Sequence, residues 1–203
     1  MLRINDIFYS LQGEGRNTGR ATVFVRLAGC NLRCPFCDTE FDTYHEMTPE
    51  EVAGNIKAIA PVARLVVLTG GEPTLQVDES FVDLLHQHGY EVAMESNGTR
   101  PAPKNLDWLT VSPKSFGEGR MMKAEGRLPD ELKIVFNEDT DPVAVLAGYM
   151  PQGNNHKPML FLQPCDTGDG SRNAAIIEAC VDYIKKHPQW RLSLQTQKYL
   201  DIK

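Results

Sequence analysis

Three cysteines that lie within eight residues of one another are the group in this sequence best suited to bind a metal. Cys30, Cys34 and Cys37 follow the spacing C-x3-C-x2-C in the stretch GCNLRCPFCDTEF. A structural zinc site needs four protein ligands, and Cys165, Cys180 or one of the five histidines would have to supply the fourth. Cys180 falls inside a helical pattern, where a buried, inert thiol is the simpler interpretation. Three thiolates could instead hold three irons of a 4Fe-4S cluster and leave the fourth iron open to an exogenous ligand.

Small and polar residues follow most of the predicted strands at their carboxyl ends. The segments after successive strands are GCNLRCPFCDT, GGEPT, SNGT, SPKS, QPCDTGDG and QTQKYLDIK. In α/β folds a ligand binds at the carboxyl ends of the strands. We therefore expect these segments, the cysteines included, to share one pocket.

Seven short and nearly continuous apolar runs predict strands that are buried on both faces. They cover residues 21–28, 64–69, 90–95, 108–112, 132–136, 159–163 and 190–195. Helical patterns cover 49–60, 79–88, 142–149 and 173–187, and Thr48 with Glu51 forms a capping box before the first. Residues 114–130 show no helical period, and we interpret them as a loop. Strands that alternate with fewer helices predict an α/β fold, a partial and open TIM-like β/α barrel with a mostly parallel sheet.

The composition limits the domain count, the compartment and the partners. A chain of 203 residues suits one domain with a substantial core, so we expect a single domain over 1–203. An excess of 27 acidic over 21 basic residues argues against nucleic-acid binding, which needs a basic face. No window holds the about 18 apolar residues of a membrane span, and the first residues lack the apolar core of a signal peptide. We expect a cytoplasmic protein, in which a tight cysteine cluster indicates metal or redox chemistry.

The order of motifs around the cysteines resembles that of the radical S-adenosylmethionine enzymes. Phe36 precedes the last cysteine, and GGEP (70–73) follows the next predicted strand. In these enzymes the open iron of the cluster binds the amino and carboxylate groups of S-adenosylmethionine, and a 5'-deoxyadenosyl radical is released. Gly70 and Gly71 would let the backbone approach the methionyl ammonium closely, and Glu72 would add negative charge near it. Taken alone, GGEP would be an ordinary turn.

Further motifs narrow the resemblance to the 7-carboxy-7-deazaguanine synthases. They are LQGEG (11–15), VFVRLAGCNLRCPFCDT (23–39), TGGEP (69–73), ESNGT (95–99), VSPK (111–114), LKIV (132–135), LQP (162–164) and QTQKYLDI (195–202). These motifs extend from one end of the chain to the other. LQGEG ahead of the cysteines is the specific element, although alone it could be a glycine-rich surface turn.

The resemblance implies a role for each matching residue. Cys30, Cys34 and Cys37 would hold the 4Fe-4S cluster, and Thr39 would be the protein ligand of a Mg2+ ion that relies on water and substrate oxygens for the rest. Contacts with S-adenosylmethionine fall on Phe36, Cys37, Asp38, Gly70, Gly71, Glu72, Gly98, Ser112, Pro113, Lys114, Gln163, Pro164, Cys165 and Asp166. Contacts with the substrate fall on Leu11, Gln12, Gly13, Glu14, Arg26, Ser96 and Lys203.

Several of these roles have a chemical reason. The planar fork of Arg26 suits the carboxylate of a pterin, and Glu14 could accept hydrogen bonds from its guanidine-like edge. Lys114 could pair with the methionyl carboxylate. Ser96 stands where a threonine is usual and keeps the hydroxyl, and Lys203 would contribute its main-chain carboxylate.

The reaction that the resemblance implies is the ring contraction of 6-carboxy-5,6,7,8-tetrahydropterin to 7-carboxy-7-deazaguanine with loss of ammonia, on the way to queuosine and other 7-deazapurines. The hard chemistry belongs to the cofactor, and the protein positions the reactants and excludes water and oxygen. No side chain is assigned as a catalytic acid or base. The family also implies a homodimer and an electron donor such as flavodoxin.

Two other functions stay open from the sequence. A radical enzyme of another kind, such as a glycyl-radical activase, would act on a protein backbone, but LQGEG and Arg26 speak against it. A non-enzymatic iron-sulfur carrier or a zinc module would not require so many polar strand ends.

Overall fold

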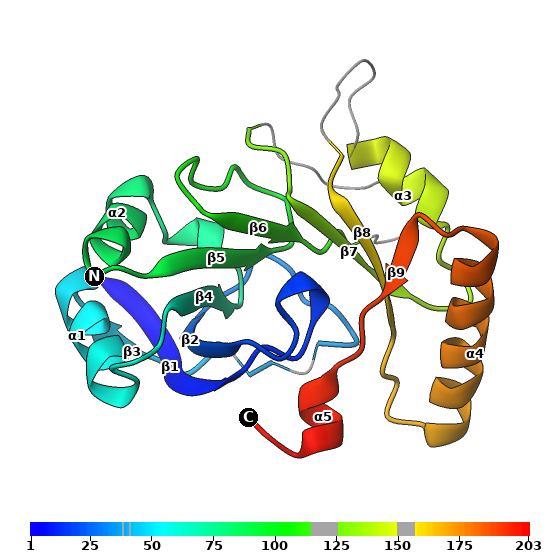
Figure 1. Cartoon of the computed structure of the whole chain (residues 1–203), viewed down its shortest axis with the longest axis horizontal. Helices are drawn as coiled ribbons and strands as arrows, with labels where there is room; N and C mark the ends of the chain where they lie inside the picture. Colours follow the sequence, from blue (N-terminus) through cyan, green and yellow to red (C-terminus); the bar gives the residue numbers. More distant parts are fainter. Residues whose placement is uncertain (38, 41, 115–125, 150–156) are drawn as a thin grey trace.

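Nine strands form one curved sheet in the computed structural model, which describes residues 1–37, 39–40, 42–114, 126–149 and 157–203 (Figure 1). The order of the strands is β3-β1-β2-β4-β5-β6-β7-β8-β9. Their bounds are β1 (Leu2–Leu11), β2 (Ala21–Leu27), β3 (His45–Met47), β4 (Leu65–Gly70), β5 (Glu91–Ser96), β6 (Trp108–Val111), β7 (Glu131–Phe136), β8 (Met159–Pro164) and β9 (Trp190–Leu192). From β2 to β9 every neighbouring pair is parallel, whereas β1 is antiparallel to both β2 and β3. The sheet curls without closing, and the predicted open, mostly parallel barrel is confirmed.

Five α-helices accompany these strands in the described part of the chain, so helices are fewer than strands, as predicted. They are α1 (Pro49–Ile59), α2 (Glu79–Gln87), α3 (Pro142–Tyr149), α4 (Gly170–Lys186) and α5 (Thr196–Leu200), with short 3-10 turns η1 (Gly15–Asn17) and η2 (Pro73–Leu75). Thr48 and Glu51 form the predicted capping box of α1. α1 to α4 lie along the outer side of the curved sheet (Figure 1). No helix among the described residues has both the length and the apolar character needed to cross a bilayer.

The core is divided by the sheet into an outer and an inner part. The large cluster lies between the sheet and the helices and contains side chains such as Val66, Leu68, Ile56 and Leu85. A smaller inner cluster of Leu65, Val67 and Ala93 is completed by Phe24 and Trp108. Successive side chains of β4 point to opposite faces of the sheet, and both faces are buried. The first four residues of this strand are therefore all apolar, and this apolar run is the signal from which the strand was predicted.

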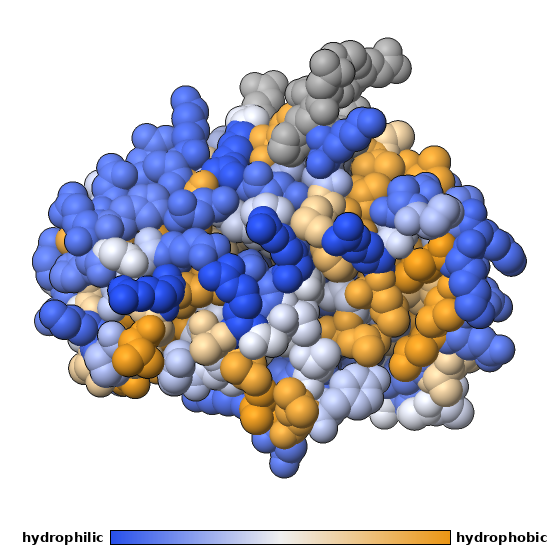
Figure 2. Space-filling view, viewed as in Figure 1, coloured by the Kyte–Doolittle hydropathy of each residue, from blue (hydrophilic) through white to orange (hydrophobic). Residues whose placement is uncertain are grey.

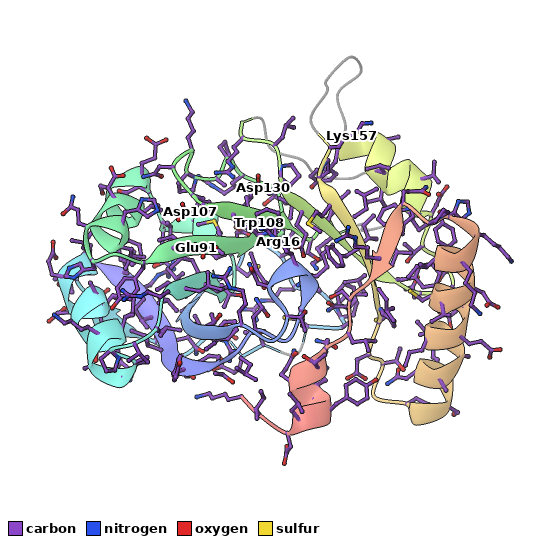
Figure 3. The ribbon with its side chains drawn as sticks, viewed as in Figure 1. Arg16, Glu91, Asp107, Trp108, Asp130 and Lys157 are labelled. Carbon is purple, nitrogen blue, oxygen red and sulfur yellow. The ribbon has the colours of Figure 1, made fainter. Side chains whose placement is uncertain are left out.

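The connection between β1 and β2 covers the amino ends of the central strands and forms the floor of the barrel. Its η1 turn brings the Arg16 guanidinium 4.1 Å from the ring centre of Trp108, the first residue of β6. The backbone N–H of Arg16 also donates to Glu131, at the start of β7. Figure 3 shows Arg16 close to residues that begin or directly precede β5, β6 and β7, which are Glu91, Asp107, Trp108 and Asp130.

The C-terminal segment closes the side of the barrel that the sheet leaves open. The backbone N–H and the hydroxyl of Thr196, at the start of α5, both donate to the carbonyl oxygen of Gly13. The sequence predicted a strand over 190–195, but the structure ends β9 at Leu192 and begins a helix at Thr196. The sequence analysis did not predict β1 or β3. Most of the loop predicted over 114–130, namely 115–125, lies outside the described residues.

Candidate active site

One cavity of about 640 Å³ lies inside the barrel and is bounded by the carboxyl ends of the parallel strands, the floor and the C-terminal segment. This volume is ordinary for a pocket that binds small molecules. The predicted site residues on its wall are Leu11, Gln12, Gly13, Glu14, Arg26, Cys30, Cys34, Phe36, Cys37, Thr39, Gly70, Gly71, Ser96, Ser112, Lys114, Gln163, Cys165, Asp166 and Lys203. The structure therefore brings together residues that are spread over the whole chain. Glu72, Gly98, Pro113 and Pro164 are not on the wall, and Asp38 lies outside the described residues.

The three clustered cysteines face this pocket as free thiols. They follow β2 in a loop that turns sharply, since the N–H of Cys37 donates to the carbonyl of Cys34 at 3.1 Å. Burial raises the pKa of Cys30 and of Cys34, so these groups are protonated at neutral pH in the free protein. A metal that binds here must displace those protons, as thiolate ligation always requires.

The arrangement of the thiols fits a cluster better than a single ion. Among the described residues, no three or more His, Cys, Asp or Glu side chains converge on one point that could hold a metal ion. A tetrahedral zinc completed by Cys165 is therefore not supported, and Cys180, a residue of α4, is fully buried in the core. A 4Fe-4S cluster takes one thiolate per iron, so its ligands need not converge on one atom. Cys30, Cys34 and Cys37, which line the cavity as free thiols, could therefore each hold one iron of such a cluster.

Gly70 and Gly71 line the pocket, and the packing of the strand end also requires that both be glycine. Gly70 has φ +119, and a Cβ there would collide with the backbone carbonyl of Leu27. At Gly71 a Cβ would collide with the carbonyl of Gly29, whose oxygen accepts a hydrogen bond from the N–H of Glu72. The two glycines thus allow the end of β4 to lie directly against the start of the cysteine loop.

Glu72, which was predicted to contribute to the S-adenosylmethionine site, lies behind the pocket wall and not on it. Its side chain is fully buried and accepts hydrogen bonds from Thr74, Ser96 and the backbone of Asn97. The hydroxyl of Ser96 therefore already donates its proton to Glu72, and its oxygen accepts a hydrogen bond from the N–H of Gly98. Through these hydrogen bonds the Glu72 side chain joins the ends of β4 and β5.

Lys114 is a partly buried cation to which the described residues offer no carboxylate. Its ammonium donates to the hydroxyl of Ser112 at 2.7 Å and lies 5.6 Å from the ring centre of Phe36. Burial lowers the pKa of Lys114, as expected for an ammonium that has lost water without gaining a counter-charge. An anionic ligand at this point would remove that penalty, which fits the carboxylate of S-adenosylmethionine.

The loop after β8 is held to α5 by its own ion pair. The Asp166 carboxylate accepts from the ammonium of Lys198 at 2.7 Å, from Asn173 and from the N–H of Gly168. The bond from Lys198 lowers the pKa of Asp166 below its ordinary value. Gln163 accepts from the hydroxyl of Ser193 at 3.0 Å. The side chains of Gln163 and Asp166 are thus already hydrogen-bonded within the protein.

A buried ion triad on the pocket wall is the main feature that the sequence did not predict. The ammonium of Lys133, in β7, pairs with Glu14 and, at 3.2 Å, with Glu95. Gln197 donates to Glu14 and Gln12 donates to Glu95. Burial alone would raise the pKa of Glu14, but the Lys133 ammonium lowers it to about 2. Burial would likewise lower the pKa of Lys133, and the two carboxylates raise it instead.

The opposite wall is aromatic and cationic. Phe8 of β1 and Phe24 of β2 stack with ring centres 5.0 Å apart. The Arg26 guanidinium lies 5.2 Å from the ring centre of Phe8, and no described carboxylate pairs with it. The ammonium of Lys203 lies on the same ring at 5.0 Å and pairs with Asp6.

Comparison with known proteins agrees with this site. A family model described as the Radical SAM superfamily matches residues 25–124. The 7-carboxy-7-deazaguanine synthase of Bacteroides thetaiotaomicron is 42% identical over 206 residues and covers 100% of both chains, and that of Bordetella pertussis is 41% identical with 98% of each chain covered. The crystal structure of QueE from Escherichia coli superposes with a TM-score of 0.79 at 26% identity, over 95% of this chain and 93% of that one.

Proposed function

Because the chain belongs to the 7-carboxy-7-deazaguanine synthase family of the radical S-adenosylmethionine superfamily, we propose that its pocket converts 6-carboxy-5,6,7,8-tetrahydropterin to 7-carboxy-7-deazaguanine with release of ammonia. The observation that supports this most directly is the content of the single cavity described above. Three free thiols, the partly buried Lys114, to which the described residues offer no carboxylate, and the residues predicted for the substrate all line it.

Two cofactors fit the residues present. Cys30, Cys34 and Cys37 would hold the 4Fe-4S cluster, and Lys114 with Ser112 would bind the carboxylate of S-adenosylmethionine beside Phe36. When bound, the two together supply a carbon-centred radical for hydrogen-atom abstraction. The protein holds the ligands in one orientation and keeps bulk water out of the barrel with the floor and the C-terminal segment.

The substrate would lie between the ion triad and the aromatic wall. Arg26 is the expected partner of the pterin carboxylate, and Glu14 is fixed as a carboxylate that can accept N–H groups of the amino-pyrimidine edge. The oxygen of the Gln197 carboxamide is buried beside Gly13 and has no hydrogen-bond partner among the described residues. Thr39, on the same wall, would bind a Mg2+ that substrate and water complete.

We also propose that the enzyme works in the cytoplasm as a single-domain protomer of a homodimer, with an external one-electron donor such as flavodoxin. The exposed apolar side chains support contact between copies. Tyr199 and Leu200 on α5 are 69% and 58% exposed, and Figure 2 shows hydrophobic surface around this helix and over the region of α3, β9 and α4.

Anaerobic reconstitution followed by turnover tests the proposal. The purified protein should develop the absorption and EPR signals of a 4Fe-4S centre, and S-adenosylmethionine should perturb the EPR signal. With reductant, Mg2+ and the carboxytetrahydropterin it should release 7-carboxy-7-deazaguanine, while Cys34→Ala should form neither cluster nor product.

Two results would contradict the proposal at different levels. Tetrahedral zinc without iron-sulfur absorption would exclude a radical enzyme. Cleavage of S-adenosylmethionine without deazaguanine formation in the presence of Mg2+ would keep the superfamily and exclude the substrate.

A further inference from the structure

The carboxamide of Asn97, in the loop after β5, lies between the end of the sheet and the cysteine loop. This side chain is almost completely buried and lines the pocket next to Cys30. Each of its polar atoms has a partner, and together these partners fix which way the amide points.

The oxygen of the Asn97 amide faces Thr99. It accepts from the backbone N–H of Thr99 at 3.0 Å and from the Thr99 hydroxyl at 2.7 Å. A backbone N–H can only donate, so the oxygen and not the nitrogen of the amide must occupy this position. The nitrogen is therefore turned toward the cysteine loop.

The two protons of the Asn97 amide nitrogen have two acceptors in that loop. The nitrogen lies 3.0 Å from Oδ1 of Asn31 and 3.9 Å from Sγ of Cys30. The amide of Asn31 donates in return to the hydroxyl of Thr99 at 2.8 Å, which completes a bridge between the loops. Sγ of Cys30 also accepts from the N–H of Leu32 at 3.4 Å.

The position of Asn97 is set from behind by the buried carboxylate of Glu72. Oε2 of Glu72 accepts from the backbone N–H of Asn97 at 2.7 Å, while Oε1 is held by Thr74 and Ser96. The acidic residue of GGEP thus acts on the cysteine loop through Asn97. All of these hydrogen bonds join protein groups, and both Glu72 and Asn97 are buried.

We propose that Asn97 is a positioning residue for the iron-sulfur cluster, one that donates an N–H···S hydrogen bond to the Cys30 thiolate and so raises the reduction potential of the cluster. This inference rests on the proposed function, because it requires Cys30 to be a cluster ligand. Hydrogen bonds to the sulfurs are among the groups of effects that set cluster potentials.

The sign of the effect follows from charge. Reduction adds an electron to a cluster whose sulfurs already carry negative charge, and an N–H donor stabilises the more negative state more strongly. Removal of the donor should therefore make reduction harder. We expect a change of about tenfold in the equilibrium constant for reduction, which is about 59 mV for one electron.

Redox titration of the reconstituted enzyme, followed by EPR, tests this with three variants. Asn97→Ala removes the donor. Asn97→Asp keeps the oxygen that Thr99 needs, removes the donor and adds a negative charge. Asn31→Ala is the matched control, because it breaks the bridge between the loops and leaves the bond from Asn97 to Cys30 in place.

At equal iron content, Asn97→Ala should have a lower midpoint potential than the wild type, Asn97→Asp a still lower one, and Asn31→Ala the wild-type value. The proposal is overturned if both Asn97 variants keep the wild-type midpoint potential. It is also overturned if Asn31→Ala shifts the midpoint potential as much as Asn97→Ala does, since loss of the bridge between the loops would then explain both shifts. Loss of the cluster from an Asn97 variant also counts against it, because one hydrogen bond to a sulfur should tune the cluster without deciding its retention. A wild-type protein without cluster would refute the proposed function instead.

Discussion

Replacement of Lys133 by methionine should destabilise the protein by about 3 kcal/mol at neutral pH. The side chain of Lys133 is 5% exposed and that of Glu14 is 15% exposed, so water screens neither charge well. The pKa of Glu14 falls from 4.5 to about 2 in the folded protein, which at about 1.4 kcal/mol per pKa unit corresponds to roughly 3 kcal/mol. Measured losses from removing one partner of a buried ion pair, about 3–5 kcal/mol, agree with this figure.

The loss should depend on pH in a defined direction. The folded-state pKa of Glu14 is depressed, so its contribution is complete above the unfolded value of 4.5 and is lost as the pH falls toward about 2. In the variant, burial without Lys133 raises the pKa of Glu14, so protonation relieves the penalty as the medium is acidified. The difference between wild type and variant should therefore be largest near pH 7 and should shrink toward pH 3. Because the pKa of Lys133 is raised, the contribution of the lysine does not change between pH 5 and 9.

Urea unfolding of the reduced, cluster-free protein, followed by circular dichroism at several pH values, measures both effects. The double variant Glu14→Gln with Lys133→Met should recover part of the stability, since Glu14 then carries no charge and only Glu95, whose side chain is 26% exposed, is left without its ammonium. Lys185→Met is the surface control, because its pair with Asp182 is 70% and 55% exposed and should matter by less than about 0.5 kcal/mol. A loss below about 1 kcal/mol at pH 7, or an equal loss at pH 4 and pH 7, would show that Lys133 does not compensate Glu14.

Three further substitutions test other parts of the pocket. Gly71→Ala should cost about 1–3 kcal/mol in urea unfolding, because its Cβ collides with the carbonyl of Gly29, whereas Gly54→Ala, in open space on α1, should stabilise slightly. Lys114→Met should weaken S-adenosylmethionine binding by about tenfold or more in equilibrium dialysis while iron content stays unchanged; unchanged affinity would remove Lys114 from the cofactor site. Arg26→Lys should raise KM for the pterin by about tenfold with a smaller effect on kcat, because the charge stays and the two-pronged contact is lost; an effect on kcat alone would argue against carboxylate binding.

The sequence predicted those elements whose signal is local. β4 to β8 are apolar runs, and α1 and α2 begin at residues with strong capping side chains, Thr48 and Asp78. β1 was missed because only part of it is buried and its residues alternate between polar and apolar, without an apolar run. α5 has no buried residue, so no hydrophobic period marks it, and its position depends on a contact with Gly13 at the other end of the chain. A contact between residues so far apart in the sequence exists only in the folded chain, so no local pattern predicts it.

Site residues that belong to recognised motifs were predicted from the sequence. The ion triad was not, because its members are distant in the sequence. A lysine inside the apolar run LKIVF is a local anomaly that could have identified Lys133. Its partners could not be identified in the same way, because Glu14 is 119 residues away and Glu95 is 38 residues away. Glu72 shows the opposite case, in which the motif was recognised but the hydrogen bond from its side chain to the loop after β5 was not predicted.

The pairing of the cations on the pocket wall explains which ligands the pocket suits. Among the described residues five lysine and arginine side chains line it, and three of them, Lys133, Lys198 and Lys203, pair with carboxylates of the protein. For Arg26 and Lys114 the described residues supply no such carboxylate, although an unpaired cation on a partly buried wall is costly. The proposed ligands carry two carboxylates, one on the pterin and one on the methionyl group. Among the described residues Arg26 and Lys114 have no carboxylate partner, so each proposed ligand would neutralise one of these two cations when both molecules are bound.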